Sequence, residues 1–318
     1  MKVLITGGAG YIGSHIAKCF KELGNEVVIL DDLSNSDAKR IESLNVEFVE
    51  ASICNSSVIS KVVSEIDLVI HCAAVKSVDE SERNPELYYD VNVGGTNVLL
   101  EVMIQHNKRE IIFASSAAVY GNSAISPIKE SDLATPISVY GKTKLQAENL
   151  ISKFSIKNNL SAISLRFFNA VGTATNSLAD TSVENLFPKV FSAIGKGVAP
   201  QIYGDDYPTK DGTCVRDYVH VIDIAEAHLA AYKSLKTTGG HRIYNVGTGI
   251  GYSVREIISE IQKISVSSID PVIMPRRKGD LDIAFADTAL IEYELNWNAR
   301  FGLEEMVRSS WLAWQNHP

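Results

Sequence analysis

Strand-length apolar runs recur through the first half of the chain, and each is separated from the next by a stretch long enough for a helix. They cover residues 3–5, 27–30, 47–49, 68–70, 110–113 and 162–165. Strands that alternate with helices are joined by crossover connections, so they line up in parallel and are covered on both faces. The sequence therefore predicts an α/β fold, a Rossmann-type doubly wound parallel sheet.

The pattern changes from about Phe168 onward, where Gly, Pro, Asp and Thr interrupt shorter helical patterns. We therefore predict a dinucleotide-binding domain over residues 1–167 and a smaller, irregular C-terminal substrate domain over residues 168–318. The stretch 221–247 has an amphipathic part and a strand-like end. It is regular enough for us to expect it to pack back onto the first domain.

Charge and hydropathy exclude several classes of partner. The chain has 318 residues and a net charge of −8, and its densest basic run is Arg276-Arg277-Lys278, which is too short for a nucleic-acid surface. Any anionic substrate must be met by a few local arginines and helix N-termini, because the overall field repels it. No apolar run of about 18 residues occurs and the chain opens with a strand, so we expect a cytoplasmic protein without a membrane partner.

The cysteines give no sign of a metal site or a redox pair. None of them stands in a CxxC pair or at metal-like spacing. We expect four buried thiols and no bound metal, at Cys19, Cys54, Cys72 and Cys214.

A glycine-rich turn, from Thr6 to Gly13, follows the first predicted strand and opens an amphipathic helix. Glycines there let the backbone turn tightly and approach a pyrophosphate, which then lies on the N–H groups of the helix start. A glycine triplet alone is weak evidence, but Asp31 stands at the end of the second strand, 18 residues after the last glycine. An acid there accepts hydrogen bonds from ribose hydroxyls and repels a 2′-phosphate, which predicts NAD rather than NADP. The alternative is that Asp31 and Asp32 form a solvated turn.

Tyr140 and Lys144 stand four residues apart at the head of a helix predicted to run to about Phe154, so both project from one face. A phenol has a reference pKa of about 10, and its use as a base near pH 7 requires a decrease of about 3, or about 4 kcal/mol. A nearby ammonium, helped by an oxidised nicotinamide, favours the phenolate. Taken alone, this spacing also fits a solvated helical face.

Ser116 follows an apolar strand and precedes a loop of small residues. The carboxyl end of a strand is where ligands bind in such sheets, so its hydroxyl would bridge Tyr140 and a substrate hydroxyl. The alternative is a structural serine at a strand end.

Together these motifs resemble the extended short-chain dehydrogenases, and among them the UDP-glucose 4-epimerase family. The likeness covers essentially the whole chain, and several of the matching segments are signatures of the substrate domain. The segments are 69–76, 88–93, 166–172, 203–220, 244–247 and 275–281. The resemblance implies that residues 168–318 bind a nucleotide sugar.

Residue by residue, the resemblance implies Tyr140 as the base, Ser116 as its partner, and Lys144 as the group that tunes the base and binds the nicotinamide ribose. It implies an NAD site built from Gly7, Gly10, Tyr11, Ile12, Gly13, Asp31, Asp32, Asn35, Ser36, Ser52, Ile53, Cys72, Ala73, Ala74, Lys76, Asn92, Ser115, Tyr140, Lys144 and Phe167. It implies a UDP-hexose site built from Lys76, Ser116, Tyr140, Asn169, Asn185, Leu186, Tyr203, Arg216, Tyr218, Arg277, Asp280 and Ala284.

The implied reaction interconverts UDP-galactose and UDP-glucose through a 4-keto sugar while bound NAD is transiently reduced. Tyr140 removes the proton of the 4-hydroxyl, and the sugar then turns over before hydride returns to its other face. A homodimer is also implied, with the helices around 87–105 and 140–154 of two subunits forming a four-helix bundle.

Related activities are separated by single positions. Nucleotide-sugar 4,6-dehydratases carry an Asp-Glu pair directly after the catalytic Ser or Thr, where this chain has Ala117 and Ala118. UDP-glucuronate and UDP-N-acetylglucosamine 4-epimerases remain alternatives for the main activity. A non-catalytic NAD-sensing regulator is the remote alternative, and such proteins typically lose the Tyr or the Lys.

The chain departs from the usual family pattern at several places. Ser52 replaces an Asp that contacts adenine, Glu184 stands where Asn or His is commoner, and the loop 173–183 looks short. Ala284 stands where members restricted to UDP-glucose and UDP-galactose carry a Tyr. A smaller side chain there leaves room for an acetamido group, so we expect N-acetylated sugars to be accepted as well. The alternative is that Ala284 merely packs a strand and a neighbouring side chain fills the gap.

Overall fold

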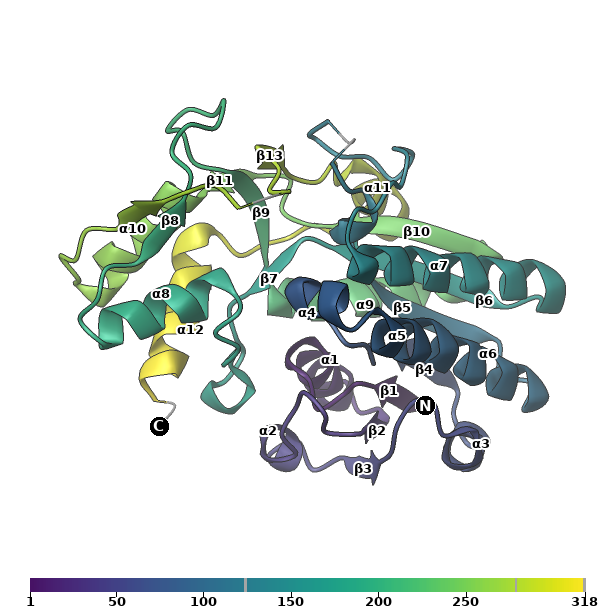
Figure 1. The fold of residues 1–318 in the computed structure, drawn as a ribbon. Helices are drawn as coiled ribbons and strands as arrows, with labels where there is room; N and C mark the ends of the chain where they lie inside the picture. The colour runs from purple at the N-terminus through teal and green to yellow at the C-terminus, as the bar shows by residue number, and fades with distance from the viewer. Residues whose placement is uncertain (123–124, 278, 317–318) are drawn as a thin grey trace.

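The computed structural model describes residues 1–122, 125–277 and 279–316, and only the backbone of 236–238. One parallel sheet dominates it (Figure 1), with strand order β10-β6-β5-β4-β1-β2-β3. The strands are β1 (Lys2–Thr6), β2 (Glu26–Asp31), β3 (Glu47–Glu50), β4 (Leu68–His71), β5 (Glu110–Ser116), β6 (Ser161–Phe167) and β10 (His241–Val246). Each predicted apolar run lies inside one strand, and the predicted Rossmann-type sheet is confirmed.

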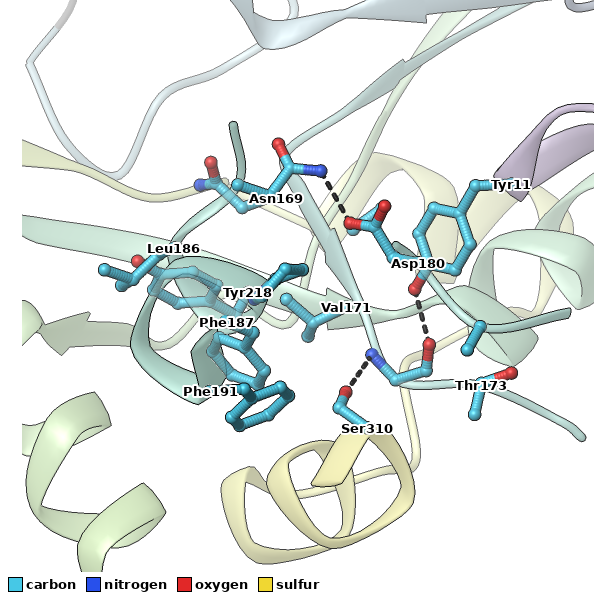
Figure 2. A pocket seen from close by; sticks show the side chains of 15 residues that line it. Tyr11, Asn169, Val171, Thr173, Asp180, Leu186, Phe187, Phe191, Tyr218 and Ser310 are labelled. Carbon is cyan, nitrogen blue, oxygen red and sulfur yellow. Dashed lines mark hydrogen bonds between the residues drawn. The ribbon is translucent and has the colours of Figure 1, made fainter. Parts of the chain in front are cut away.

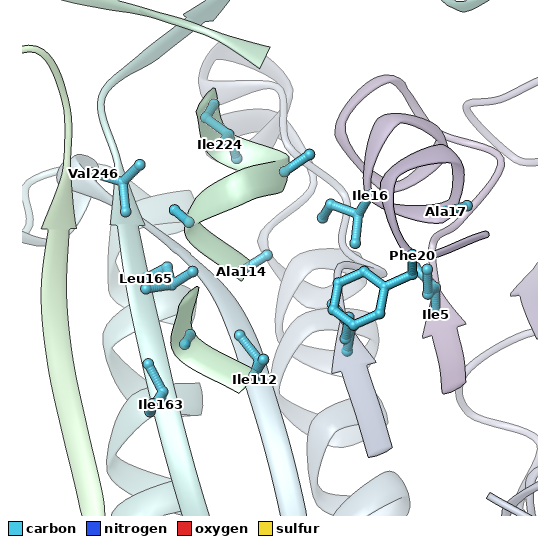
Figure 3. Close-up of a cluster of buried hydrophobic side chains, with 14 of the residues drawn as sticks. Ile5, Ile16, Ala17, Phe20, Ile112, Ala114, Ile163, Leu165, Ile224 and Val246 are labelled. Atoms are coloured by element: carbon cyan, nitrogen blue, oxygen red, sulfur yellow. The ribbon is translucent and has the colours of Figure 1, made fainter. Parts of the chain in front are cut away.

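Helices cover both faces of this sheet because its strands are apolar on both sides. One face carries α1 (Tyr11–Glu22) and α9 (Val221–Thr238), and the other carries α3 (Ser56–Val63), α6 (Gly95–Gln105) and α7 (Val139–Asn158). Successive strand residues point to opposite faces. Ile5 therefore packs with Ile16 and Phe20 of α1 (Figure 3), whereas Leu4 joins the core on the other face.

A smaller part of the molecule follows β6. Its main sheet combines β7 (Asn169–Val171), β9 (Val215–His220), β11 (Gly251–Ser253) and β13 (Ile283–Ala284), and a second pairs β8 (Gln201–Tyr203) with β12 (Val272–Met274). A third apolar core lies among α8 (Leu186–Gly195), α10 (Val254–Ser265) and α12 (Leu303–Gln315). These elements place Asn169 and Tyr218 on neighbouring strands, in register with each other.

The remaining elements are short. They are α2 (Lys39–Glu42), α4 (Val78–Arg83), α5 (Pro85–Tyr88), the π-helical turn η1 (Tyr89–Gly94), the 3-10 turns η2 (Ala117–Val119) and η3 (Asn176–Leu178), and α11 (Ala289–Leu295).

The chain does not stay in the smaller part once it has entered it. After β9 it returns through α9, which packs against α1, and through β10, which pairs with β6 at the edge of the large sheet. The domain division at residue 167 stays a prediction, because the large sheet draws on residues from both sides of it.

Two sequence expectations can be compared directly with burial and helix length. The expectation of four buried thiols is wrong for Cys54, which is exposed because it lies in the turn that precedes α3, while Cys19 and Cys72 are partly buried and Cys214 is buried. Within the described ranges, no helix combines the length and apolarity needed to span a membrane.

Candidate active site

The glycine-rich turn packs backbone against backbone. Gly7 has a φ of +68°, and a side-chain carbon on it would lie 2.5 Å from the backbone nitrogen of Ala73. A side-chain carbon on Gly13 would collide with the carbonyl of Gly7. No side chain caps α1 at Gly10, so the N–H groups at the start of the helix remain available to a ligand. The glycines leave a cradle in front of these groups, and a larger residue in their place would fill it. This geometry fits a dinucleotide pyrophosphate.

Asp31 closes one side of this turn. It is 8% exposed, its Oδ2 accepts a 3.0 Å hydrogen bond from the Ala9 N–H, and its Oδ1 accepts from the Ser36 hydroxyl at 2.8 Å. The carboxylate is therefore fixed at the end of β2, where an adenosine ribose would lie. Asp32 is exposed and accepts only from the Ser34 N–H at 3.0 Å, so the solvated-turn reading describes Asp32 and does not describe Asp31.

Asn92, which we predict on the cofactor side, is held by hydrogen bonds within the protein. Its side chain is buried, donates 3.0 Å hydrogen bonds to the Val75 carbonyl and the Thr143 hydroxyl, and accepts from the Val75 N–H at 2.9 Å. These contacts use the amide to fix the segment after β4 against α7. Asn92 therefore positions the segment that carries Ala73, Ala74 and the exposed Lys76.

The other predicted cofactor residues line the same edge of the large sheet or its flanks. Ile53 is buried against Gly95, Ser52 accepts a 3.2 Å hydrogen bond from the Cys54 N–H, and Phe167 ends β6. Asn35 is exposed in the loop after β2.

Tyr140 and Lys144 occupy the first turns of α7, as predicted, and Ser138 caps this helix by accepting a 3.0 Å hydrogen bond from the Gly141 N–H. Lys144 is 4% exposed, and its Nζ donates a 2.8 Å hydrogen bond to the Ala114 carbonyl on β5. The same Nζ lies 5.9 Å from the centre of the Tyr140 ring.

Burial dominates the electrostatics of Tyr140 and Lys144. Burial raises the pKa of the Tyr140 phenol, and a hydrogen bond from Ser116 lowers it by less. Burial lowers the pKa of the Lys144 ammonium to about 8. In the protein without its cofactor, burial therefore outweighs the Ser116 hydrogen bond, and the phenol is not brought toward neutrality by these groups alone. The lowering depends on further positive charge, which an oxidised nicotinamide carries.

A pocket lies between the start of α1 and the smaller part of the molecule (Figure 2). Its cavity volume is about 110 Å³. Its lining includes residues predicted for the NAD site and residues predicted for the UDP-hexose site. They are Tyr11 for the first, and Asn169, Asn185, Leu186 and Tyr218 for the second. Phe187 and Tyr218 stack with ring centres 5.7 Å apart, which gives the pocket an aromatic wall suited to a flat base.

Asp180 is a pocket residue that the sequence did not reveal. Its Oδ2 accepts a 2.6 Å hydrogen bond from the Asn185 amide, and both residues line the pocket. Nothing in the local sequence distinguishes Asp180 from an ordinary loop acid. Only the return of the 173–185 loop to the start of α1 places it here.

Neither of the predicted phosphate ligands, Arg216 and Arg277, is among the residues that line this pocket. Arg216 on β9 donates to the Leu281 carbonyl at 2.7 Å and lies 3.7 Å from the Asp280 carboxylate. The Arg277 guanidinium lies 3.8 Å from the centre of the Tyr203 ring. These contacts hold both arginines near one edge, where they can meet a diphosphate.

Ala284 on β13 is opposite Arg216 in the strand register and is 8% exposed. It belongs to an apolar cluster with Phe168 and Val119, and Ala117 packs against that cluster. The position therefore borders the loop that follows Ser116, with a large ring beside it.

Comparison with known proteins agrees with this geometry. Residues 3–247 match the NAD dependent epimerase/dehydratase family. The UDP-glucose 4-epimerase of Erwinia amylovora is 42% identical, covering 99% of this chain and 98% of its own.

Solved structures extend the likeness to the fold. A UDP-glucose-4-epimerase from Stenotrophomonas maltophila, with bound NAD and formylated UDP-arabinopyranose, superposes with a TM-score of 0.95 at 38% identity and covers 99% of this chain and 98% of its own. The UDP-Glc/GlcNAc 4-epimerase of Campylobacter jejuni gives a TM-score of 0.88 at 34% identity and covers 99% of both chains. The chain therefore belongs to the NAD-dependent epimerase/dehydratase family, and within it to the UDP-glucose 4-epimerases.

Proposed function

We propose that this protein interconverts UDP-glucose and UDP-galactose, using NAD held at the glycine-rich turn. The observation that carries the proposal is the convergence of Ser116, Tyr140 and Lys144 at the carboxyl end of the large sheet. This point lies between the cradle at Gly7 and the substrate-side strands.

The protein's own groups would act on the proton of the sugar 4-hydroxyl. Tyr140 accepts that proton as a phenolate, Ser116 donates a hydrogen bond that stabilises the phenolate, and Lys144 supplies positive charge from one turn away. An NAD held at the glycine-rich turn and Asp31 would supply the hydride acceptor and donor for carbon 4 of the sugar. The absence of an acid at Ala117 and Ala118 leaves elimination of the 6-hydroxyl without a catalyst.

The nucleotide would be held by two groups of residues that the pocket and its edge supply. The aromatic wall at Tyr218, with Asn169 and Leu186, suits the uridine side of the ligand. Arg216 and Arg277 would meet the diphosphate, whose charge the overall field of the protein opposes.

We further propose that UDP-N-acetylglucosamine and UDP-N-acetylgalactosamine are substrates. Ala284 is much smaller than the Tyr of the restricted members, and it belongs to the apolar cluster against which Ala117 of the loop after Ser116 packs. The related enzyme of Campylobacter jejuni is described as a UDP-Glc/GlcNAc 4-epimerase. If the prediction is wrong, another side chain of this cluster fills the space.

We also propose a homodimer formed through α6 and α7 and the short helices before α6. These helices lie side by side along one face of the large sheet (Figure 1). Leu87 on α5 is 42% exposed and Ile156 on α7 is 85% exposed, which leaves apolar surface for a partner helix. The cytoplasmic location stays a prediction.

One assay tests the proposed function. Purified protein is mixed with UDP-galactose, and the formation of UDP-glucose is followed to equilibrium, with UDP-glucuronate and UDP-N-acetylglucosamine tested in parallel. Equilibration of the first pair supports the proposal. Turnover of the uronate alone would assign the main activity elsewhere, and no turnover of any sugar would favour the NAD-sensing alternative.

A further inference from the structure

Glu148 is a buried acid that the proposed reaction leaves unexplained. It stands on α7 one turn after Lys144 and two turns after Tyr140, on the same face of the helix. Its side chain is 2% exposed. An acid is rarely buried to this extent without a specific partner.

Two partners hold this carboxylate, and both belong to the large sheet. Its Oε1 accepts hydrogen bonds from the Ser115 hydroxyl at 2.5 Å and from Arg166 Nε at 3.0 Å. Its Oε2 accepts from Arg166 Nη2 at 2.7 Å. The Arg166 side chain is only 5% exposed, so this is a two-pronged ion pair inside the protein.

The partners are the chain neighbours of proposed site residues. Ser115 directly precedes Ser116 on β5, and Arg166 directly precedes Phe167 on β6. Lys144 reaches the same strand β5 through the Ala114 carbonyl. Glu148 and Lys144 therefore fasten the inner face of α7 to consecutive residues of β5, and this sets the distance between Tyr140 and Ser116.

Charge around Lys144 gives Glu148 a second effect. Burial lowers the pKa of Lys144, and Cys72 and Glu148 act in the opposite direction. Burial also raises the pKa of the Cys72 thiol to about 12 and lowers that of the neighbouring His71 to about 3, so both are uncharged near neutral pH. The ion-paired carboxylate of Glu148 is then the charge that favours the ammonium.

The surroundings of Glu148 itself are similarly defined. Besides Arg166, the titratable groups that face it are His241 from β10 and Tyr120 from the turn after β5. Burial lowers the pKa of His241 to about 4, so it is neutral near pH 7.

We propose that Glu148 is a positioning residue for proton transfer in this enzyme. It acts through Ser115, which sets the place of Ser116, and through Lys144, whose ammonium its carboxylate supports. This inference rests on the function proposed above, because it concerns the same base.

The test is the pH profile of Glu148→Gln in the epimerase assay. We expect kcat with UDP-galactose to fall at least about tenfold, as for the loss of a general-base contribution, while KM stays within about twofold. We also expect the alkaline limb of the kcat profile to move to lower pH, because Lys144 loses the carboxylate that favours its charged form. Glu148→Asp keeps the charge and should restore the position of the limb even if kcat stays low.

Two further variants separate positioning from folding. The double variant Glu148→Gln/Arg166→Gln removes the buried arginine that the single variant leaves unpaired. Its free energy of unfolding should therefore recover, while the alkaline limb of its kcat profile stays at the lower pH. Asp223→Asn is the matched control, since it alters another fully buried carboxylate that pairs with an arginine, Arg300, away from the site. It should leave the limb unmoved.

The outcomes are distinguishable from failure of the proposed function. A wild-type protein that does not epimerise UDP-galactose refutes the function itself. The inference is overturned if the wild type is active and Glu148→Gln leaves the alkaline limb of the kcat profile at the wild-type pH. It is also overturned if the double variant recovers the wild-type profile. In either case Glu148 is only structural.

Discussion

His15 accepts a 3.1 Å hydrogen bond from the backbone N–H of Ala174 through its Nε2. Its Nδ1 lies 2.8 Å from the Tyr11 carbonyl, which can only accept, so the proton resides on Nδ1 and the ring is neutral. The Tyr11 hydroxyl donates to the Gly172 carbonyl at 2.5 Å. The first helix of the large sheet thus holds the turn at 172–174, from which the loop to Asn185 begins.

This arrangement predicts loss of stability in acid. Burial lowers the pKa of His15 to about 4 in the folded protein. A group with a lowered pKa stabilises the fold above its unfolded pKa of about 6.5, and this contribution is lost as pH falls from 6.5 through 4, by about 3 kcal/mol. Urea unfolding at pH 7 and pH 4 should show a decrease, since His71, His220, His228 and His241 shift in the same direction, although the raised pKa of Asp223 opposes it. His15→Gln should be less stable at pH 7 and lose less on acidification; an unchanged dependence on pH would contradict it.

Replacing Tyr140 by Phe should remove most turnover and leave the fold and bound NAD intact, because only the proton acceptor is lost. General-base catalysis contributes about 10²–10⁴-fold, so kcat should fall by that range in the UDP-galactose assay. The melting temperature and the dinucleotide content serve as controls. A variant that keeps more than about a tenth of the wild-type kcat would exclude Tyr140 as the base.

Purified protein should carry dinucleotide without any being added, because the redox cycle closes within one turnover. Mixing with UDP-galactose should produce a transient absorbance of reduced nicotinamide, followed by stopped flow. A Gly7→Ala variant should bind less dinucleotide, since the added carbon would lie 2.5 Å from the Ala73 nitrogen. A strict need for stoichiometric external NAD or NADP would refute the closed cycle.

Ala284→Tyr should remove turnover of the N-acetylated sugars and spare UDP-galactose, because steric exclusion disfavours only the larger sugar. The ratio of kcat/KM for the two substrates measures the effect directly. Ala284→Ser is the volume-matched control and should change the ratio little. Equal slowing of both substrates, or a wild type without N-acetyl activity, would show that Ala284 does not control substrate breadth.

Light scattering at assay concentration should give about twice 34.7 kDa. Leu87→Glu places a charge in the proposed interface and should shift the protein toward the monomer. Leu312→Glu is the matched control, since Leu312 is 51% exposed on α12, outside the proposed helices. An active wild-type protein that is purely monomeric would contradict the dimer.

The parallel sheet was predictable because its strands are buried on both faces and read as apolar runs. The ends of the strands were less predictable. β5 continues through the polar residues Ser115 and Ser116 because their backbone still pairs with β6. The helix predicted to end near Phe154 runs on to Asn158 because the left-handed Asn159 stops it there.

The site residues form two groups, those that a local sequence pattern reveals and those that only long-range contacts reveal. Tyr140 and Lys144 are recognisable because their spacing is local. Glu148 continues that spacing, but it reads as one more polar residue of a helix, and only its contacts with Ser115 and Arg166 show that it faces inward. Asp180 and the role of Asn92 likewise depend on long-range contacts that no local pattern encodes.

The place of β10 in the large sheet has a consequence for biosynthesis. β6 ends at Phe167 and is buried along most of its length, yet one of its two partners begins only at His241. While the chain emerges from the ribosome, β6 is an edge strand with unpaired N–H and C=O groups and apolar faces. A chain that ends between Phe167 and His241 leaves one edge of β6 unpaired and prone to aggregation. Protection by a chaperone therefore matters most in the interval before residue 246 has been synthesised.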